Sequence, residues 1–280
     1  MPDRRLAEGA AELLRELRAR RPLIHNITNF VVMNFTANAL LSAGASPVMA
    51  HAAEEVEEMV SLAGALVLNI GTLTPTWVEG MLKAGRRANE RGVPVVLDPV
   101  GSGATKLRTD SARRLARELR VSVVRGNASE VLSLAGTGAG TRGVDAIHGV
   151  EEAIDAAKAL AAELKSTLAI TGPVDLVTDG SRVLRVSNGH ELMGRVTGTG
   201  CAATALIGAF LAVAEDAVEG TAAALSYFGV AGEEAASAAR APGSFQVALL
   251  DALYTIDGTR LAKDARIDEQ TPAGSRFQGA

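Results

Sequence analysis

The sequence predicts an α/β fold in which a mostly parallel, doubly wound sheet carries helices on both faces. Two observations lead to this prediction. Short apolar runs alternate with helical stretches between residues 22 and 171. The runs are apolar along their whole length, as in residues 65–68 and 93–97, and strands buried on both faces are typical of parallel sheets covered by helices.

The elements follow in order along the chain. A helix is expected first, over residues 3–20, because Leu6, Leu13, Leu14 and Leu17 recur at helical spacing. The alternating pattern then predicts strands at residues 22–27, 47–50, 65–70, 93–97, 121–124 and 167–171, with helices at 30–42, 54–63, 75–91, 111–119 and 150–164.

The pattern changes after residue 172. Two β-rich runs, at 174–177 and 183–186, flank the turn Asp179-Gly180-Ser181 and predict a β-hairpin. A Gly-rich loop follows, and then only helices, at 201–215, 217–240 and 244–256. From Asp264 the sequence has no periodicity, so a disordered tail is expected over 264–280. Neither a repeat nor a linker divides residues 1–280, which we expect to form a single domain.

The composition excludes several classes of function. A formal net charge of −4 disfavours a nucleic-acid-binding surface. A single cysteine rules out an internal disulfide or a cysteine-based zinc site, and suits a reducing compartment. The first thirty residues have no apolar signal core, and the longest apolar run is too short to span a bilayer. We therefore expect a cytoplasmic protein with no membrane partner.

The stretch Val196-Thr197-Gly198-Thr199-Gly200-Cys201 contains that cysteine and precedes an apolar run over residues 202–214 that predicts a buried helix. Two glycines at the start of a buried helix leave backbone N–H groups open to a ligand, and the helix dipole adds positive charge there. The sequence therefore predicts an anion site, most often a phosphate site, beside a thiol.

Polar or Gly-rich residues follow five of the predicted strands. In open α/β sheets, ligands bind at the carboxyl ends of the strands, so five such exits together indicate a site. The exits are His25-Asn26-Ile27-Thr28-Asn29, Asn69-Ile70-Gly71-Thr72, Asp98-Pro99-Val100-Gly101, Arg125-Gly126-Asn127-Ala128-Ser129-Glu130 and Thr171-Gly172-Pro173.

The acids at these exits are Asp98 and Glu130. Mg2+ bound with a nucleotide takes one or two carboxylates besides water and phosphate oxygens, and these two side chains could supply them. Glu130 could instead cap a helix, because Asn127-x-x-Glu130 is also the pattern of a helix capping box. The sequence leaves both roles open.

Three other candidate site residues each allow two interpretations. Arg125 could reach a phosphate or form a structural ion pair. The hydroxyl of Thr171 could contact a nucleotide or serve only the local turn. Met49 could line an apolar pocket or belong to the core.

Two common phosphate motifs do not explain the glycine loop. The Walker A pattern is absent from the sequence. Gly198-x-Gly200-x-x-Ala203 matches a loose dinucleotide fingerprint, but that reading needs a strand to follow the helix, and residues 204–260 read as helices.

Seven stretches, in order between residue 22 and about residue 262, together resemble the hydroxyethylthiazole kinase family, a thiamine-salvage branch of the ribokinase-like superfamily. They are His25-Asn26-Ile27-Thr28-Asn29, Ser46-Pro47-Val48-Met49, Leu68-Asn69-Ile70-Gly71-Thr72-Leu73, Asp98-Pro99-Val100-Gly101, Arg125-Gly126-Asn127-Ala128-Ser129-Glu130, Thr171-Gly172 and Thr197-Gly198-Thr199-Gly200-Cys201.

The resemblance implies ATP- and Mg2+-dependent phosphorylation of the hydroxyl of 4-methyl-5-(2-hydroxyethyl)thiazole by a ribokinase-like homotrimer with active sites at subunit interfaces. The residues fall into three groups by that resemblance. Arg125 and Thr171 match ATP-binding positions. Asp98 and Glu130 match the acids that organise Mg2+ and its waters. Met49, Gly198, Asn26 and Gly71 match substrate-binding positions.

Cys201 occupies the position where the wider superfamily keeps an aspartate base. Our hypothesis is that the amides of residues 198–201, including Gly198 and Gly200, supply most of the catalysis, and that Cys201 adds a smaller acid–base contribution. Two rival functions stay open from the residues. One is a related kinase acting on a hydroxymethylpyrimidine or a sugar hydroxyl, and the other is a thiol-based redox sensor.

Overall fold

The computed structural model describes residues 3–135 and 150–270. Within these residues, nine strands form one sheet in the order β2-β1-β3-β4-β5-β6-β7-β8-β9. Strands β1 to β6 are parallel, and β7 to β9 continue the sheet antiparallel. The strands are β1 Leu23–Ile27, β2 Ser46–Val48, β3 Ala65–Asn69, β4 Val95–Asp98, β5 Val123–Gly126, β6 Thr167–Ile170, β7 Asp175–Thr178, β8 Val183–Val186 and β9 Ile267–Glu269.

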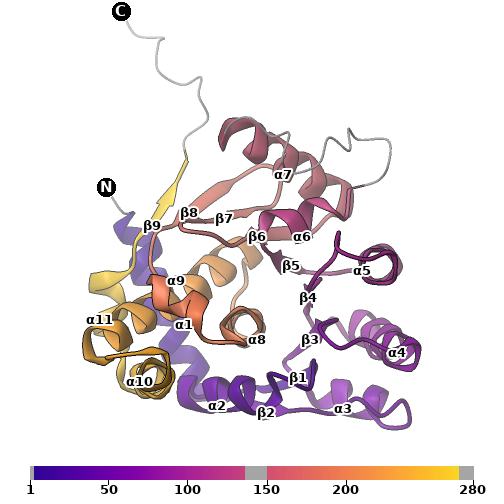
Figure 1. The fold of residues 1–280 in the computed structure, drawn as a ribbon, viewed down its shortest axis with the longest axis horizontal. Coiled ribbons are helices and arrows are strands. Elements are labelled where there is room, and N and C mark those ends of the chain that lie inside the picture. The colour runs from indigo at the N-terminus through magenta and orange to yellow at the C-terminus, as the bar shows by residue number, and fades with distance from the viewer. Residues whose placement is uncertain (1–2, 136–149, 271–280) are drawn as a thin grey trace, which may run out of the picture.

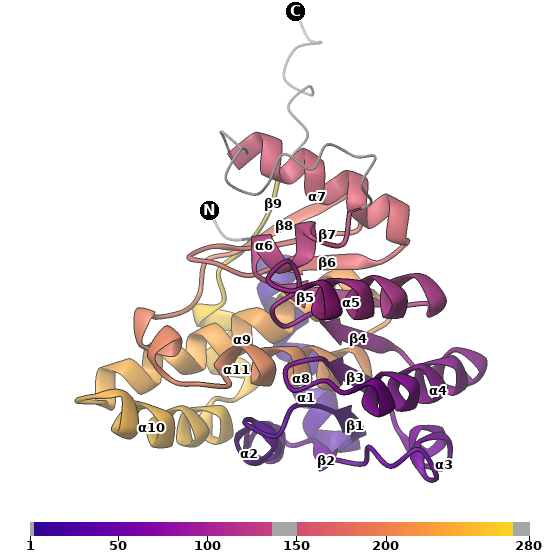
Figure 2. The same ribbon diagram turned by 45° about the vertical axis from the view of Figure 1, so that its right-hand side comes forward.

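Helices cover both faces of this sheet (Figures 1 and 2). One face carries α3 Val56–Leu62, α4 Pro75–Arg91, α5 Lys106–Glu118, α6 Ala128–Leu132 and α7 Val150–Leu164. The other carries α1 Arg4–Arg20, α2 Met33–Ala43, α8 Thr199–Leu211, α9 Ala217–Ala238, α10 Pro242–Thr255 and α11 Gly258–Asp264. A short 3-10 helix, Glu191–Arg195, precedes α8. The predicted doubly wound α/β architecture is confirmed.

Each face of the sheet contributes to a separate hydrophobic core. Along β3, for example, Val67 packs with the α8 and α9 side, whereas Leu66 and Leu68 pack with the α4 and α5 side. This alternation follows from the two-residue period of a strand. It also explains why the strand sequences are apolar throughout.

Helix α8 is the most deeply buried helix beside the site. Its residues from Ala202 to Leu211 are all buried, between α2, α9 and the sheet. Small residues allow this close approach: a Cβ at Gly208 would lie only 2.8 Å from Val67 Cγ2. The amino end of α8 is thereby held against the carboxyl ends of the parallel strands.

The structure corrects the prediction for the C-terminal part of the chain. The disordered tail expected from Asp264 is wrong where the structure describes it: Asp264 ends α11, and residues 267–269 form β9 and pair with β8. The expectation of helices only after residue 200 is wrong for the same reason. Backbone pairing and burial of Ile267 order this segment, although its sequence has no alternating pattern. The rest of the expected tail, residues 271–280, lies outside the described residues.

Candidate active site

The polar exits of five neighbouring parallel strands meet at one edge of the sheet. Side chains from three of them form a continuous set of contacts. Asn69 Nδ2, at the end of β3, donates to Asp98 Oδ2, at the end of β4, over 2.8 Å. Asn29, just after β1, donates from Nδ2 to Asn69 Oδ1 over 2.9 Å. The predicted convergence is therefore present in the structure.

Asp98 is almost completely buried, with 1% of its surface exposed. It also accepts a hydrogen bond from Thr204 Oγ1 of α8 at 2.7 Å, and Arg125 Nη1 lies 4.0 Å from its Oδ2 atom. Burial raises the pKa of Asp98 to about 6, although Arg125 and the hydrogen bond from Thr204 oppose the shift. Asp98 is a buried carboxylate whose charge a nearby cation would stabilise.

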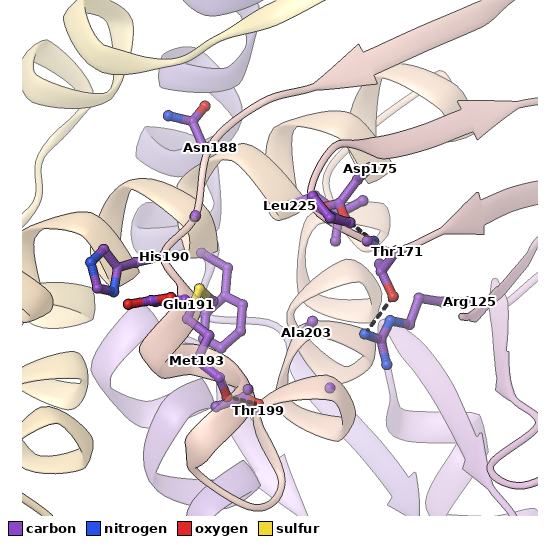
Figure 3. Close-up of a pocket in the computed structure, with 17 residues that line it drawn as sticks. Arg125, Thr171, Asp175, Asn188, His190, Glu191, Met193, Thr199, Ala203 and Leu225 are labelled. Carbon is purple, nitrogen blue, oxygen red and sulfur yellow. Dashed lines mark hydrogen bonds between the residues drawn. The ribbon is translucent and has the colours of Figure 1, made fainter. Parts of the chain in front are cut away.

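A cavity of about 540 Å³ opens beside Arg125 and Thr171 (Figure 3). Arg125 Nη2 donates to Thr171 Oγ1 over 2.8 Å, and both residues line the cavity together with Gly200. Asp175 lies on the same wall, where its Oδ1 accepts from Gly172 N over 2.9 Å. The structure thus brings together the two residues assigned to ATP and one glycine of the predicted anion loop.

The loop before α8 and helix α9 also line this cavity. They contribute polar and apolar groups: His190, Glu191 and Met193 from the loop, and Leu225 and Phe228 from α9. A cavity of this size with an apolar wall and an arginine at one end suits a ligand that has a flat apolar part and an anionic part.

The amino end of α8 has the geometry of an anion site. Gly198 is the N-cap, with a left-handed backbone at φ 89°, and Ala202 N makes the first intrahelical bond to Gly198 O. The N–H groups of residues 199–201 precede that bond and have no partner within the helix. They are therefore available, together with the helix dipole, to an anion.

Cys201 stands in the first turn of α8 and is partly buried. Its Sγ atom accepts a hydrogen bond from Asn29 Nδ2 at 3.5 Å. Burial, together with the negative charge of Asp98, raises the pKa of the Cys201 thiol to about 11. The thiol is therefore protonated at neutral pH in the absence of a ligand.

Glu130 forms the capping box that its sequence pattern suggested. Its Oε2 atom accepts from Asn127 N at 3.0 Å, and Glu130 N donates to Asn127 Oδ1 at 2.9 Å. The Oε1 atom also accepts from Gly101 N at 2.8 Å, which joins α6 to the loop after β4. Among residues 3–135 and 154–270, no group of three or more His, Cys, Asp or Glu side chains could hold a metal ion by itself.

The remaining predicted site residues lie away from the cavity beside Arg125. Asn26 is buried on β1, and its Oδ1 atom has no hydrogen-bond partner among residues 3–135 and 150–270. Gly71 follows β3, and its carbonyl accepts from Arg108 Nη2 at 2.7 Å. Met49 follows β2 and is partly buried. None of these three residues lines that cavity.

Four residues at this edge were not assigned a role from the sequence: Asn29, Asn69, Thr204 and Asp175. Asn29 and Asn69 do stand in the polar exits, so their place at the site could be predicted. The hydrogen bond between them could not. Thr204 lies inside the apolar run of α8, where a single threonine indicates nothing. Asp175 begins a hairpin strand and has no distinguishing pattern.

The family model of the hydroxyethylthiazole kinase family matches residues 14–259, which is most of the chain. The chain belongs to the hydroxyethylthiazole kinase family. A hydroxyethylthiazole kinase of Desulfotalea psychrophila is 59% identical over 266 residues, covering 95% of this chain and 97% of that protein. One of Chloroflexus aurantiacus is 55% identical over 262 residues, covering 94% and 97%.

Solved structures agree with this family membership. A hydroxyethylthiazole kinase of Pyrococcus horikoshii superposes with a TM-score of 0.86 at 50% identity, covering 94% of this chain and 99% of that one. A ribokinase-like superfamily protein of Enterococcus faecalis, 13% identical, superposes with a TM-score of 0.63 over 89% of this chain and 95% of its own. This second likeness concerns the fold alone. The fold of this chain is thus ribokinase-like, as predicted.

Proposed function

We propose that this protein transfers the γ-phosphoryl group of ATP to the hydroxyl of 4-methyl-5-(2-hydroxyethyl)thiazole. In this reaction a bond forms between the alcohol oxygen and the γ-phosphorus, and the bond to the β–γ bridging oxygen breaks to release ADP. The observation that carries the proposal is the amino end of α8, which stands beside the Arg125 cavity in a chain of this family.

The proposed ATP site is the 540 Å³ cavity. Arg125 would neutralise a phosphate, while Thr171 holds its guanidinium in place through the 2.8 Å hydrogen bond. The apolar wall formed by Leu225 and Phe228 would take the base of the nucleotide. The phosphates would then extend toward Gly200.

The backbone N–H groups of residues 199–201 would stabilise the charge on the transferring phosphoryl group. Phosphoryl transfer has a loose transition state and depends mainly on positioning and charge stabilisation. Because the thiol of Cys201 is protonated at neutral pH, it is a weak base in the resting protein. We therefore assign the larger share of the rate to the amides and a smaller share to Cys201.

Asp98 and Glu130 are the proposed acids for Mg2+. Asp98 is a buried carboxylate with a raised pKa, and both oxygens of Glu130 already accept backbone hydrogen bonds. These residues fit an ion that takes one or two carboxylates and otherwise water and phosphate oxygens. When bound, Mg2+ would neutralise phosphate charge. Glu130 would act mainly through water.

The thiazole alcohol is assigned to Asn26, Met49, Gly71 and Gly198. The unpartnered Oδ1 atom of the buried Asn26 supports a polar contact in this region. Phe30 and Val31, four and five residues after Asn26, are large apolar side chains exposed by 63% and 66%. These exposed side chains support a homotrimer in which another subunit completes the pocket.

We further propose that residues 1–280 form one domain and that the protein acts in the cytoplasm. Within the part of the chain that the structure describes, no helix is long and apolar enough to cross a membrane.

The direct test incubates purified protein with ATP, Mg2+ and hydroxyethylthiazole and follows the mass of the alcohol. The proposal expects the alcohol to gain one phosphoryl group in step with ADP release. Hydroxymethylpyrimidine and sugars serve as competing acceptors. Faster transfer to one of these acceptors, or none to the thiazole, would contradict the proposed substrate.

A further inference from the structure

Two side-chain amides connect the thiol of Cys201 to the carboxylate of Asp98. Asn69 Nδ2 donates to Asp98 Oδ2 at 2.8 Å, Asn29 Nδ2 donates to Asn69 Oδ1 at 2.9 Å, and Asn29 Nδ2 also donates to Cys201 Sγ at 3.5 Å. Both asparagines are buried, with 4% or less of their surface exposed. This chain of contacts joins β1, β3, β4 and α8.

The orientation of each amide follows from Asp98. An ionised carboxylate only accepts hydrogen bonds, so the NH2 group of Asn69 must face it. The Asn69 Oδ1 atom then points the other way, where it accepts from Gly71 N and from Asn29. Asn29 is fixed in turn, because its own Oδ1 atom accepts from Val31 N at 3.2 Å. Flipping either amide would place donors against donors.

Close packing holds the Asn29 amide in this orientation. A Cβ atom at Gly71 would lie 2.6 Å from Asn29 Nδ2, so the backbone of the loop after β3 passes directly over it. Since Asn29 presents a donor, the sulfur of Cys201 is the acceptor in their contact. The proton of a neutral Cys201 thiol must therefore point away from Asn29.

We propose that Asn29 and Asn69 are positioning residues for phosphoryl transfer, which orient the Cys201 thiol through two fixed amides anchored on Asp98. This inference rests on the proposed function for its kinetic consequence. Asn29 presents a hydrogen-bond donor to the sulfur, and Asn69 fixes Asn29 and also donates toward the sulfur. Removing either amide takes away part of what orients the Cys201 thiol at the amino end of α8.

A double-mutant cycle tests whether Asn29 acts through Cys201. We expect Asn29→Ala to lower kcat at least about threefold, and by no more than Cys201→Ala lowers it. In the Cys201→Ala background, the same substitution should lower kcat less than about twofold. KM for ATP should change by less than about twofold, because Asn29 does not line the cavity. Equal losses in both backgrounds, or no loss in either, would overturn the proposal.

Alkylation gives a second readout that needs no turnover. Cys201 is the only cysteine of the chain, so the mass gained with iodoacetamide at fixed pH reports on this thiol alone. A donor to sulfur favours the reactive thiolate, so Asn29→Ala should slow alkylation at least about threefold. If Asn29 were only a steric cover, its removal would expose the sulfur and speed the reaction. An unchanged or faster rate would overturn the proposal.

Controls separate these outcomes from general damage. Asn34→Ala, at an exposed position on α2, should change neither kcat nor the alkylation rate. If Asn29→Ala does not fold, Asn29→Leu, which keeps a similar side-chain volume without the donor or a charge, replaces it in both experiments. If the wild-type protein does not phosphorylate the thiazole, the proposed function fails, but the alkylation experiment still decides whether Asn29 fixes the thiol.

Discussion

Thr204 Oγ1 donates to Asp98 Oδ2 over 2.7 Å and so joins the interior of α8 to the end of β4. Both side chains are buried, and Asp98 is the acid whose pKa burial raises to about 6. The helix that presents the amides and the strand that presents the acid are thus fixed to each other by one hydrogen bond between buried groups.

Thr204→Val should destabilise the protein, because it leaves Asp98 buried with one donor fewer. A hydrogen bond to a charged group contributes about 1.5–3 kcal/mol, and urea unfolding at pH 8 would measure the loss. Thr221→Val is the matched control, since Thr221 is equally buried but its Oγ1 has no hydrogen-bond partner in the described part of the chain. An equal loss for the two variants would show that the bond to Asp98 contributes nothing specific.

Gly200→Ala should weaken ATP binding while the fold is retained. The new Cβ atom would lie 2.8 Å from Arg125 Nη1, so the guanidinium must move away from Thr171 and the cavity. We expect KM for ATP to rise about tenfold, equal to about 1.4 kcal/mol of lost binding. Gly9→Ala is the control, because an added methyl there has open space. An unchanged KM for ATP would show that ATP binding does not depend on the present position of the Arg125 guanidinium.

Asp175→Asn should make the protein more stable above pH 7. Burial raises the pKa of Asp175 to about 6, against about 3.9 in the unfolded chain. The folded state therefore binds the proton more tightly, and stability is lost as pH rises from about 4 to about 6. Asparagine keeps the acceptor for Gly172 N without the charge. The melting temperature of Asp175→Asn, measured at a series of pH values, should therefore not show this loss of stability.

Asp179→Asn, on the same hairpin, is the control with the opposite sign. Burial opposes the shift, but hydrogen bonds from Arg182 N and from Ser181 hold the pKa of Asp179 below its usual value. Its ionised form therefore stabilises the fold at neutral pH, and Asp179→Asn should lower the melting temperature there. A shift of the same sign in both variants would contradict the assigned pKa directions.

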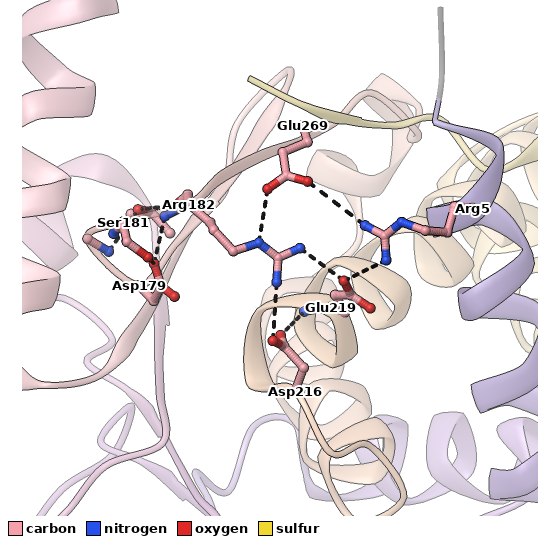
Figure 4. Close-up of polar contacts among 9 residues, drawn as sticks. Arg5, Asp179, Ser181, Arg182, Asp216, Glu219 and Glu269 are labelled. Carbon is pink, nitrogen blue, oxygen red and sulfur yellow. Dashed lines mark hydrogen bonds and ion pairs between the residues drawn. The ribbon is translucent and has the colours of Figure 1, made fainter. Parts of the chain in front are cut away.

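Arg182→Met should destabilise the C-terminal strand. The guanidinium contacts Glu269 of β9 at 2.9 Å, Glu219 of α9 at 2.9 Å and Asp216 at 3.2 Å (Figure 4). A shared network contributes more than an isolated surface pair, so we expect a loss of about 1–2 kcal/mol in urea unfolding, reduced by salt. Arg4→Met removes a single exposed pair with Glu8 and should cost less than about 0.5 kcal/mol.

The sequence was sufficient to predict the parallel sheet and the edge where the site lies. Apolar strand runs and polar exits are local features, and parallel strands bring their carboxyl ends together whatever the helices between them contain. The predicted grouping of Arg125 with Thr171 is seen directly. The fold of residues 267–269 could not be predicted, because β9 depends on pairing with β8 and on Arg182, which lies more than eighty residues earlier.

The contacts between side chains within the site could not be predicted from the sequence either. Nothing in the order of residues indicates that Asn29 and Asn69 share a hydrogen bond, since that depends on how β1 and β3 lie side by side. The sequence did not indicate a role for Thr204, because its hydrogen-bond partner, Asp98, belongs to a strand far away along the chain. The raised pKa of Cys201 likewise follows from burial, which only the packed structure shows.

The central claim is that the amides at the amino end of α8, rather than the thiol, supply most of the catalysis. The kcat of Cys201→Ala tests it, with Cys201→Asp as a companion that should stay active because its carboxylate occupies a base-like position. We expect folded Cys201→Ala to lose less than about 10²-fold in kcat, below the range of a strong general base. A loss near 10⁴-fold, with the fold and ATP binding intact, would contradict the claim.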